Sequence, residues 1–144
     1  KEEELSYWIK MFCDDYGTLK YRDKIEAYIE KLPSEPASII HQFIDESGLQ
    51  RGKLCEKIGI RESSLRHWEQ VAKPSKPSFV NLVSLIEALC LPMELSYHLL
   101  EKYGYDGEIK AKVNVTHRIL IEECPFSPYE DKLAFINEST EKNK

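Results

Sequence analysis

The chain has 144 residues, of which 42% are hydrophobic and 31% charged, and its net charge is −5. This length favours one domain that buries roughly two-thirds of its unfolded surface, and the net acidity excludes a protein that coats nucleic acid indiscriminately. No apolar run approaches the roughly 20 residues of a membrane span, and the acidic start is unlike a signal peptide. Because the first residue is Lys1, we expect either a processed chain or a piece of a longer one.

An N-terminal helical pair is predicted over residues 1–33. The first helix covers residues 2–16, where apolar and aromatic side chains recur at helical spacing. Its apolar face consists of Leu5, Trp8, Ile9, Phe12 and Tyr16. Thr18 can cap the second helix, which ends near Leu32. The apolar side of that helix consists of Tyr21, Ile25, Tyr28, Ile29 and Leu32. Two roles are open for this pair, because it can pack on the rest of the chain or supply a dimer surface.

Five further helices are expected over residues 34–104. The first follows the break at residues 33–36, with Ser34 as its cap, and closes at Gly48. Its apolar stripe consists of Ile39, Ile40, Phe43 and Ile44. After a loop over residues 71–77, Ser78 caps the fourth helix, and the fifth ends at Gly104. The apolar positions of these last two helices are Phe79, Leu82, Val83, Leu85, Ile86, Leu89, Leu95, Leu99 and Leu100.

The second and third of these five helices are predicted to form a helix-turn-helix. Leu54 and Ile58 repeat at i, i+4, and Gly59 follows where the chain leaves the helix, a position that favours a positive φ. Ile60 can fill the corner between the two helices, and the third helix covers residues 61–70. We assign its apolar side, Leu65 and Trp68, to the core.

One pattern of residue types at fixed spacing, a joint register, extends over four of these helices. It is carried by Leu54, Cys55, Glu56, Lys57, Ile58, Gly59, Ile60, Ser63, Ser64, Leu65 and Glu69, and then by Pro77, Ser78, Phe79, Leu82, Leu85, Ala88 and Leu89. In this register the chain, over about residues 36–102, resembles the Cro/Xre-type helix-turn-helix domain of phage repressors and related bacterial regulators. The resemblance implies a compact five-helix repressor-like domain whose helix 61–70 enters a DNA major groove.

A C-terminal helical extension is predicted over residues 105–144. Residues 105–113 have too little periodicity to assign and suggest a loop. Asn114 can cap a helix that Pro125 stops, and residues 127–130 have the form of a capping box before a last helix. The apolar positions of these two helices are Val115, Ile119 and Leu120, and then Leu133, Phe135 and Ile136. A polar, frayed end follows from residue 137, so the whole chain is expected to be all-α.

The resemblance also implies which residues meet DNA. Gln50 and Arg51 fall at the phosphate-contacting start of the first motif helix. Base-facing positions are Glu62, Ser63, Ser64 and His67, with Arg61 and Arg66 beside them. The residue chemistry agrees in part, because Arg can bond guanine O6 and N7, Ser either base type and Glu the cytosine amine. Lys73 and Lys76, in the loop after this helix, can hold a phosphate electrostatically.

Charge is distributed unevenly along the chain. Residues 50–77 hold seven basic and three acidic side chains, a net charge of +4, whereas the remaining residues carry −9. A basic patch on an acidic body suits a protein that meets phosphate on one face, although an ordinary solvated helical surface has the same composition. Glu62 can read a cytosine amine, can pair with Arg66 at i+4, or can keep this helix out of DNA. His67 can contact a base or be an exposed polar residue.

Metal, cofactor and catalytic sites are not expected. The four cysteines, Cys13, Cys55, Cys90 and Cys124, form no Cys-x-x-Cys motif, and the four histidines have no metal-ligand spacing. Reduced thiols in a cytoplasm are the better interpretation, with Cys55 and Cys90 as small buried residues. Adjacent acidic residues point about 100° apart on a helix, which indicates solvated faces rather than a shared proton site.

Two classes of function are consistent with these patterns. One is a bacterial or phage transcriptional regulator, a homodimer that binds double-stranded DNA at a two-fold symmetric operator with half-sites about 34 Å apart. The alternative is a protein-interaction module, such as an antitoxin or adaptor, that holds a partner protein through its N- or C-terminal helices. A fold resemblance does not by itself decide between them.

Overall fold

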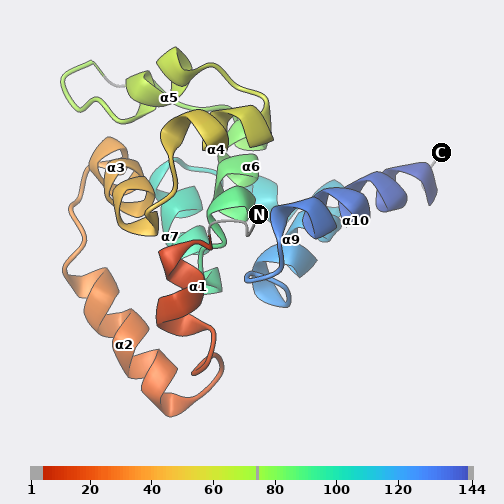
Figure 1. Cartoon of the computed structure of the whole chain (residues 1–144), viewed down its shortest axis with the longest axis horizontal. Helices are drawn as coiled ribbons and strands as arrows, with labels where there is room; N and C mark the ends of the chain where they lie inside the picture. Colours follow the sequence, from red (N-terminus) through yellow and green to blue (C-terminus); the bar gives the residue numbers. More distant parts are fainter. Residues whose placement is uncertain (1–4, 74, 143–144) are drawn as a thin grey trace.

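The computed structural model describes residues 5–73 and 75–142, and helices are the only regular secondary structure within those residues. In chain order these are α1 (Tyr7–Phe12), α2 (Leu19–Glu30), α3 (Pro36–Ser47), α4 (Arg51–Ile58), α5 (Glu62–Trp68), α6 (Phe79–Leu89), α7 (Met93–Lys102), α8 (Asp106–Ile109), the 3₁₀ helix η1 (Lys112–Asn114), α9 (Val115–Glu122) and α10 (Tyr129–Lys142). The predicted all-α class is confirmed. In Figure 1, α6 lies near the centre, with α4 and α5 above it and α9 and α10 to its right.

The first helix is shorter than its periodicity predicts. The Ser6 side chain accepts a hydrogen bond from the Trp8 backbone N–H at 3.3 Å, and α1 therefore begins at Tyr7. Leu5 lies outside the helix and is 54% exposed, so its predicted place on the apolar face is wrong. Residues 2–4 of the predicted helix lie outside the described residues.

The α1 helix is anchored to the centre of the molecule. Trp8 is fully buried, and its indole Nε1–H donates to the Phe43 carbonyl oxygen at 3.0 Å. The Ser6 hydroxyl donates to the Leu89 carbonyl oxygen at 2.7 Å. Of the two roles left open for the N-terminal pair, α1 therefore takes core packing.

The second helix begins as predicted. The Thr18 side chain accepts from the Tyr21 N–H and caps α2, and buried Tyr21 and Ile25 face the rest of the chain. The Tyr21 hydroxyl also donates to a Glu94 carboxylate oxygen at 2.5 Å, which joins α2 to α7. This bond and the aromatic contacts of α1 and α2 place both helices of the pair on one core.

Glycine ends two of the central helices. Gly48 has φ 75° after α3 and Gly59 has φ 73° after α4, as the spacing predicts for Gly59. At the start of α3 the N-cap is Glu35 rather than the predicted Ser34. Pro36 occupies the first helical position, where its missing N–H costs nothing.

The C-terminal extension differs most from its prediction. Residues 105–113, predicted as a loop, contain α8 and most of η1, and Ile109 is fully buried. The last helix extends to Lys142 instead of fraying from residue 137. Leu133 and Phe135, predicted to be apolar positions of this helix, are 36% and 37% exposed, whereas Lys132 is 2% exposed.

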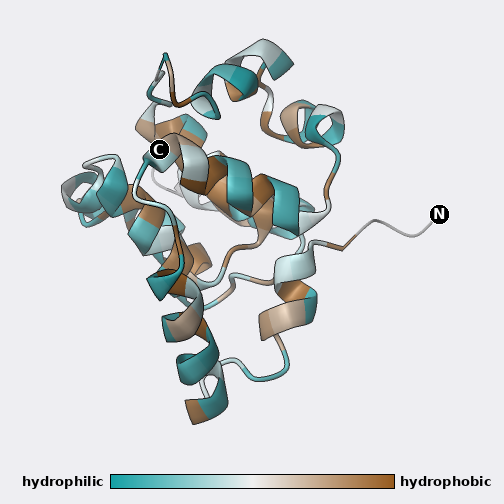
Figure 2. Cartoon of the chain, turned by 90° about the vertical axis from the view of Figure 1, so that its left-hand side faces the viewer, coloured by the Kyte–Doolittle hydropathy of each residue, from teal (hydrophilic) through white to brown (hydrophobic). Residues whose placement is uncertain are grey.

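One hydrophobic core joins the three predicted segments. Buried residues of the same cluster include Trp8 from residues 1–33, Leu85 from 34–104 and Ile121 from 105–144. Figure 2 shows the corresponding pattern, in which apolar and polar residues occupy different sides of the helices. No helix within the described residues is both long and apolar enough to cross a membrane.

Candidate nucleic-acid interface

The α4–turn–α5 unit has a local cause at each step. Gly59 takes the left-handed conformation, and the Ile60 N–H then bonds the Cys55 carbonyl oxygen at 3.0 Å, which turns the chain away from α4. Arg61 is the N-cap of α5, which is shorter than the predicted helix 61–70 because the chain leaves the helix at Glu69. The predicted core assignment of Leu65 and Trp68 is confirmed, since they are 1% and 5% exposed.

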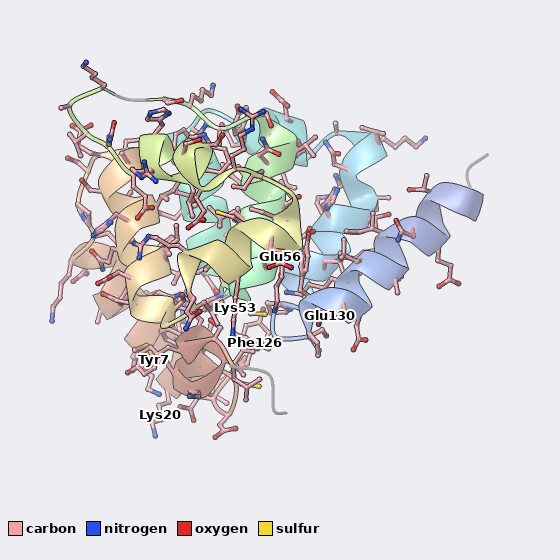
Figure 3. The ribbon with its side chains drawn as sticks, turned by 45° about the horizontal axis from the view of Figure 1, so that its top comes forward. Tyr7, Lys20, Lys53, Glu56, Phe126 and Glu130 are labelled. Atoms are coloured by element: carbon pink, nitrogen blue, oxygen red, sulfur yellow. The ribbon has the colours of Figure 1, made fainter. Side chains whose placement is uncertain are left out.

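Because Leu65 and Trp68 face the core, the opposite side of α5 faces solvent. Most of the predicted contact residues, on α5 and in the segments beside it, are exposed. The exposed ones are Gln50, Arg61, Glu62, Ser63, Arg66, His67, Lys73 and Lys76. Arg51 and Ser64 are half-buried. Figure 3 views the molecule from the side that carries this unit, with α4 in front of α6. Most of the predicted residues are thus available to a ligand, and Arg51 is the important exception.

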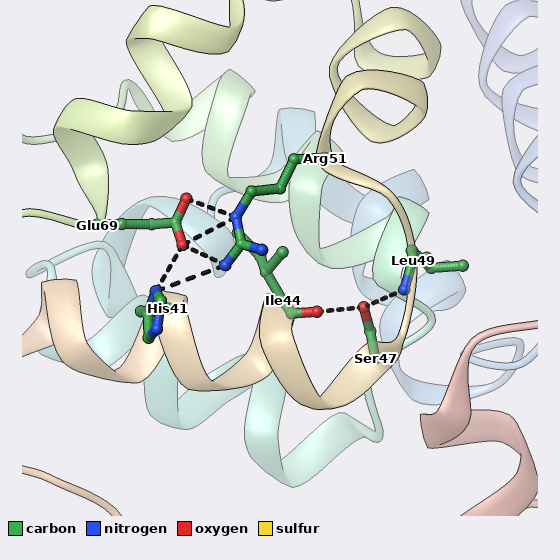
Figure 4. Close-up of polar contacts among 6 residues, drawn as sticks. All are labelled: His41, Ile44, Ser47, Leu49, Arg51 and Glu69. Carbon is green, nitrogen blue, oxygen red and sulfur yellow. Dashed lines mark hydrogen bonds and ion pairs between the residues drawn. The ribbon is translucent and has the colours of Figure 1, made fainter.

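Arg51 is held by an acidic side chain that the sequence did not single out as a partner. Its guanidinium donates to both carboxylate oxygens of Glu69, with Nη2–Oε1 at 2.7 Å and Nε–Oε2 at 3.1 Å (Figure 4). The Nδ1 of His41 lies 2.8 Å from Glu69 Oε1, so the cluster joins α3, α4 and the end of α5. The hydrogen bond with Glu69 raises the pKa of Arg51, and the Glu69 side chain is only 9% exposed.

The charge of Arg51 is therefore compensated within the protein. Arg–carboxylate pairs with two parallel bonds are among the stronger polar contacts in proteins. A phosphate that binds Arg51 in this geometry has to compete with Glu69. We name Arg51, Glu69 and His41 the α5 clamp.

A surface cavity of about 320 Å³ adjoins the α5 clamp. Its walls come from α3, α4, α5 and the residues after α5, namely His41, Arg51, Glu62, Leu65, Arg66, Glu69 and Gln70. Three predicted contact residues, Arg51, Glu62 and Arg66, thus lie around one cavity. Ser63, His67 and the two loop lysines are not part of its lining.

Glu62 turns toward α4. One of its carboxylate oxygens lies 3.5 Å from the position that a Cβ on Gly52 would occupy, in the first turn of α4. The described residues include no ion pair between Glu62 and Arg66, so that option is wrong for this structure. A carboxylate near the first turn of a helix is favoured by the helix dipole, which gives Glu62 a structural reason to be acidic.

The loop after α5 is fixed at its far end. Lys76 Nζ lies 4.5 Å from the centre of the Tyr105 ring, and the Tyr105 hydroxyl donates to the Pro77 carbonyl oxygen at 2.7 Å. Lys73 is exposed, and Pro74 lies outside the described residues. Lys76 is exposed and its ammonium lies over the Tyr105 ring, whereas Lys73 has no such contact in the described part of the chain.

Ion pairs within the protein compensate some of the basic side chains of residues 50–77. Besides the α5 clamp, Lys57 pairs with Glu130 of α10 at 3.9 Å. Figure 3 labels Glu130 where α10 begins, near α4. No ion pair is found for Arg61, Arg66 or Lys73 within residues 5–73 and 75–142. Lys53 of α4 has no ion pair in the described part of the chain either, so several cations of the α4–α5 side remain uncompensated.

No group of His, Cys, Asp and Glu within the described residues is arranged to hold a metal ion.

The chain matches no family model, no curated protein and no solved structure.

Two residues of the site were missed from the sequence. Glu69 lies four residues after buried Leu65, so a helical reading of residues 61–70 places it on the inner side of α5. That spacing could have identified it as a partner for a basic side chain. His41 comes from α3 and had no such signal, because only the packing of α3 against the other helices brings it to Glu69.

Proposed function

We propose that the chain is a sequence-specific DNA-binding transcriptional regulator that docks through the α4–α5 side. The observation that carries this proposal is the exposed row on α5, where Arg61, Ser63, Arg66 and His67 point to solvent while Leu65 and Trp68 fix the helix from behind. An exposed short helix held rigidly by its apolar side is the arrangement that inserts into a major groove.

Different residues would have different roles in this docking. Arg66 and Arg61 can each form two bonds to guanine, and Ser63 can bond any base edge. Lys73 would contact the phosphate backbone and so contribute affinity without sequence preference. Homodimerisation on a two-fold symmetric operator is part of the proposal, because one α5 helix reads only a few base pairs.

The test is selection from a pool of random-sequence duplexes at low and at physiological salt. We expect enrichment of a palindromic motif and an affinity that falls as salt rises. Lys73→Ala should weaken binding to all sequences and reduce the salt slope, whereas Ser63→Ala or His67→Ala should change the preferred bases. Retention of no duplex even at low salt would contradict the proposal.

A matched control separates this face from general electrostatics. Lys20 is an exposed lysine of α2, which Figure 3 places on the side of the molecule away from α5. Lys20→Ala changes the net charge by the same amount as Lys73→Ala. We expect it to leave affinity and salt slope nearly unchanged, and an equal loss in both variants would show that no particular face binds.

A second candidate, a protein-interaction module of the antitoxin or adaptor kind, is supported by the α5 clamp. Glu69 removes Arg51 from the cations available to phosphate, and Glu62 adds a negative charge to the same cavity. Both features weaken an electrostatic attraction for DNA and suit a polar protein partner. Salt-independent failure to bind DNA, together with capture of a defined partner that Arg66→Ala abolishes, would favour this candidate.

A further inference from the structure

A buried amine and a buried thiol meet where α10 packs on the end of α6. Lys132 is 2% exposed and Cys90 is 5% exposed. The Lys132 Nζ donates to the carbonyl oxygens of Pro125 at 2.7 Å and Glu87 at 2.9 Å, and it lies 3.7 Å from the Cys90 Sγ. Carbonyl groups from two segments therefore hold the nitrogen against the sulfur.

This lysine lacks the usual partner of a buried cation. No carboxylate lies within ion-pair distance of Lys132 among the described residues, and the carboxylate of Glu87 instead contacts His117 Nδ1 at 2.7 Å. Burial lowers the pKa of Lys132, so more of it is the neutral amine than in a solvated lysine. Only the neutral amine has a lone pair that can attack an electrophile.

The backbone fixes the cysteine in an unusual position. Cys90 has φ 56° and is the one non-glycine residue with positive φ in the described part of the chain. Its Sγ lies 3.5 Å from the Ser127 carbonyl oxygen and 3.7 Å from that of Glu87. Side chains in the left-handed region are strained, and such positions concentrate at functional sites.

A surface cavity of about 180 Å³ reaches Lys132 of this pair, whereas Cys90 is not part of its lining. Its lining comes from α9, α10 and their connection and consists of Leu120, Cys124, Ser127, Asp131, Lys132 and Phe135. The volume is many times the roughly 10–15 Å³ that a water molecule needs, so a hydrogen peroxide molecule fits as well. A second thiol, Cys124, lines the same cavity and is the rival partner for an oxidised sulfur.

We propose that Cys90 and Lys132 are a modification site, at which a hydroperoxide converts the contact between them into a covalent sulfur–nitrogen cross-link. In the first step the thiol sulfur attacks the peroxide O–O bond, which gives a sulfenic acid and one water. In the second step the neutral amine attacks that sulfur and the S–O bond breaks. The hydroxide that leaves takes the amine proton to form a second water. The peroxide is reduced, and the protein loses two hydrogens.

The burial that protects this cross-link also slows its formation. Burial raises the pKa of the Cys90 thiol, and thiols with little thiolate are oxidised slowly. Cys13 is exposed and should therefore react first. The experiment accordingly uses the full chain with Cys13→Ser, treated with hydrogen peroxide and followed by intact-mass and peptide-mapping spectrometry.

We expect a mass decrease of about 2 Da, with the peptides of Cys90 and Lys132 joined and a thiol reductant able to separate them. The joined form should also have a higher midpoint of thermal unfolding, because the link ties α10 to the end of α6. A disulfide between Cys90 and Cys124 lowers the mass equally, so the control is Cys124→Ser, in which the cross-link should persist.

Two further variants complete the test. Lys132→Arg keeps a buried donor but has no nucleophilic amine, and Cys90→Ser removes the sulfur, so both should lose the mass decrease in the Cys124→Ser background. Peptides that join Cys90 to Cys124, a sulfinic acid at Cys90 beside an unmodified Lys132, or an unreacted Cys90 under peroxide that oxidises Cys124 would each overturn the proposal. The cross-link does not rest on DNA binding, so it succeeds or fails separately from the proposed function.

Discussion

Glu69→Gln probes the α5 clamp with the smallest change in shape. The substitution keeps the side-chain volume and one acceptor oxygen but removes the charge that both Arg51 and His41 face. A hydrogen bond to a charged group contributes about 1.5–3 kcal/mol, and a fully exposed ion pair about 0–1 kcal/mol. The Glu69 side chain is 9% exposed and that of Arg51 is 37% exposed, so solvent screens part of the interaction.

From this intermediate exposure we expect the free energy of unfolding to fall by about 1–2 kcal/mol. For a chain of this size the midpoint of thermal unfolding should fall by roughly 2–4 °C per kcal/mol, which calorimetry or circular dichroism can measure. DNA binding should change in the opposite direction, because the released guanidinium of Arg51 becomes available to one phosphate. The slope of log affinity against log salt should become steeper by about 0.9.

The opposite signs distinguish this reasoning from a general loss of structure. Glu62→Gln is the matched control, because it removes a negative charge from the same cavity but leaves the α5 clamp intact. It should raise affinity only weakly and cost little stability. In Arg51→Ala combined with Glu69→Gln the gain in salt slope should vanish. A stability loss in Glu69→Gln without a steeper slope would refute the idea that Arg51 is a latent phosphate contact.

Other consequences of the fold can be measured with the same unfolding assays. Gly59→Ala should lower stability by about 1–2 kcal/mol, because φ 73° strains any side chain although no atom lies within 4 Å of the new Cβ; an unchanged midpoint would contradict the left-handed turn. Trp8→Phe should cost about 1–3 kcal/mol, because the Phe43 carbonyl loses its indole donor while the ring packing is mostly kept. At alkaline pH the chain should lose stability, because burial raises the pKa of Tyr21 and Tyr28 above its ordinary value of 10.0. Their contribution is complete below pH 10 and decreases as unfolded tyrosines ionise above it, so urea midpoints that stay level from pH 9 to 11 would contradict the burial of these hydroxyls.

Local signals predicted much of this fold correctly. Gly59, Thr18 and Ser78 mark helix ends through short-range geometry, and each is found where its spacing places it. Leu65 and Trp68 are buried because a strong apolar period fixes the rotation of even a short helix. Such features depend only on residues a few positions apart, which a sequence displays directly.

The missed features depend on contacts between distant segments. Ile109 is buried although its surroundings lack periodicity, because α8 is too short to show a helical period and is held by its neighbours. The apolar pattern of α10 pointed to Leu133 and Phe135, whereas the packed side carries Lys132. Lysine is rarely buried, so only the carbonyl oxygens supplied by α6 and the turn before α10 explain its place.

These distant contacts also join residues 34–104 to the residues before and after them. Glu87 lies inside it, on α6, and is 2% exposed, so its carboxylate needs a partner within the protein. That partner is His117 of α9, and the Glu87 carbonyl oxygen accepts from Lys132 of α10. One residue of α6 thus satisfies groups from both C-terminal helices, while Ser6 bonds the end of the same helix from the N-terminal side. Because buried polar groups on α6 are completed from both flanks, we expect residues 34–104 and their flanks to unfold together, in one transition.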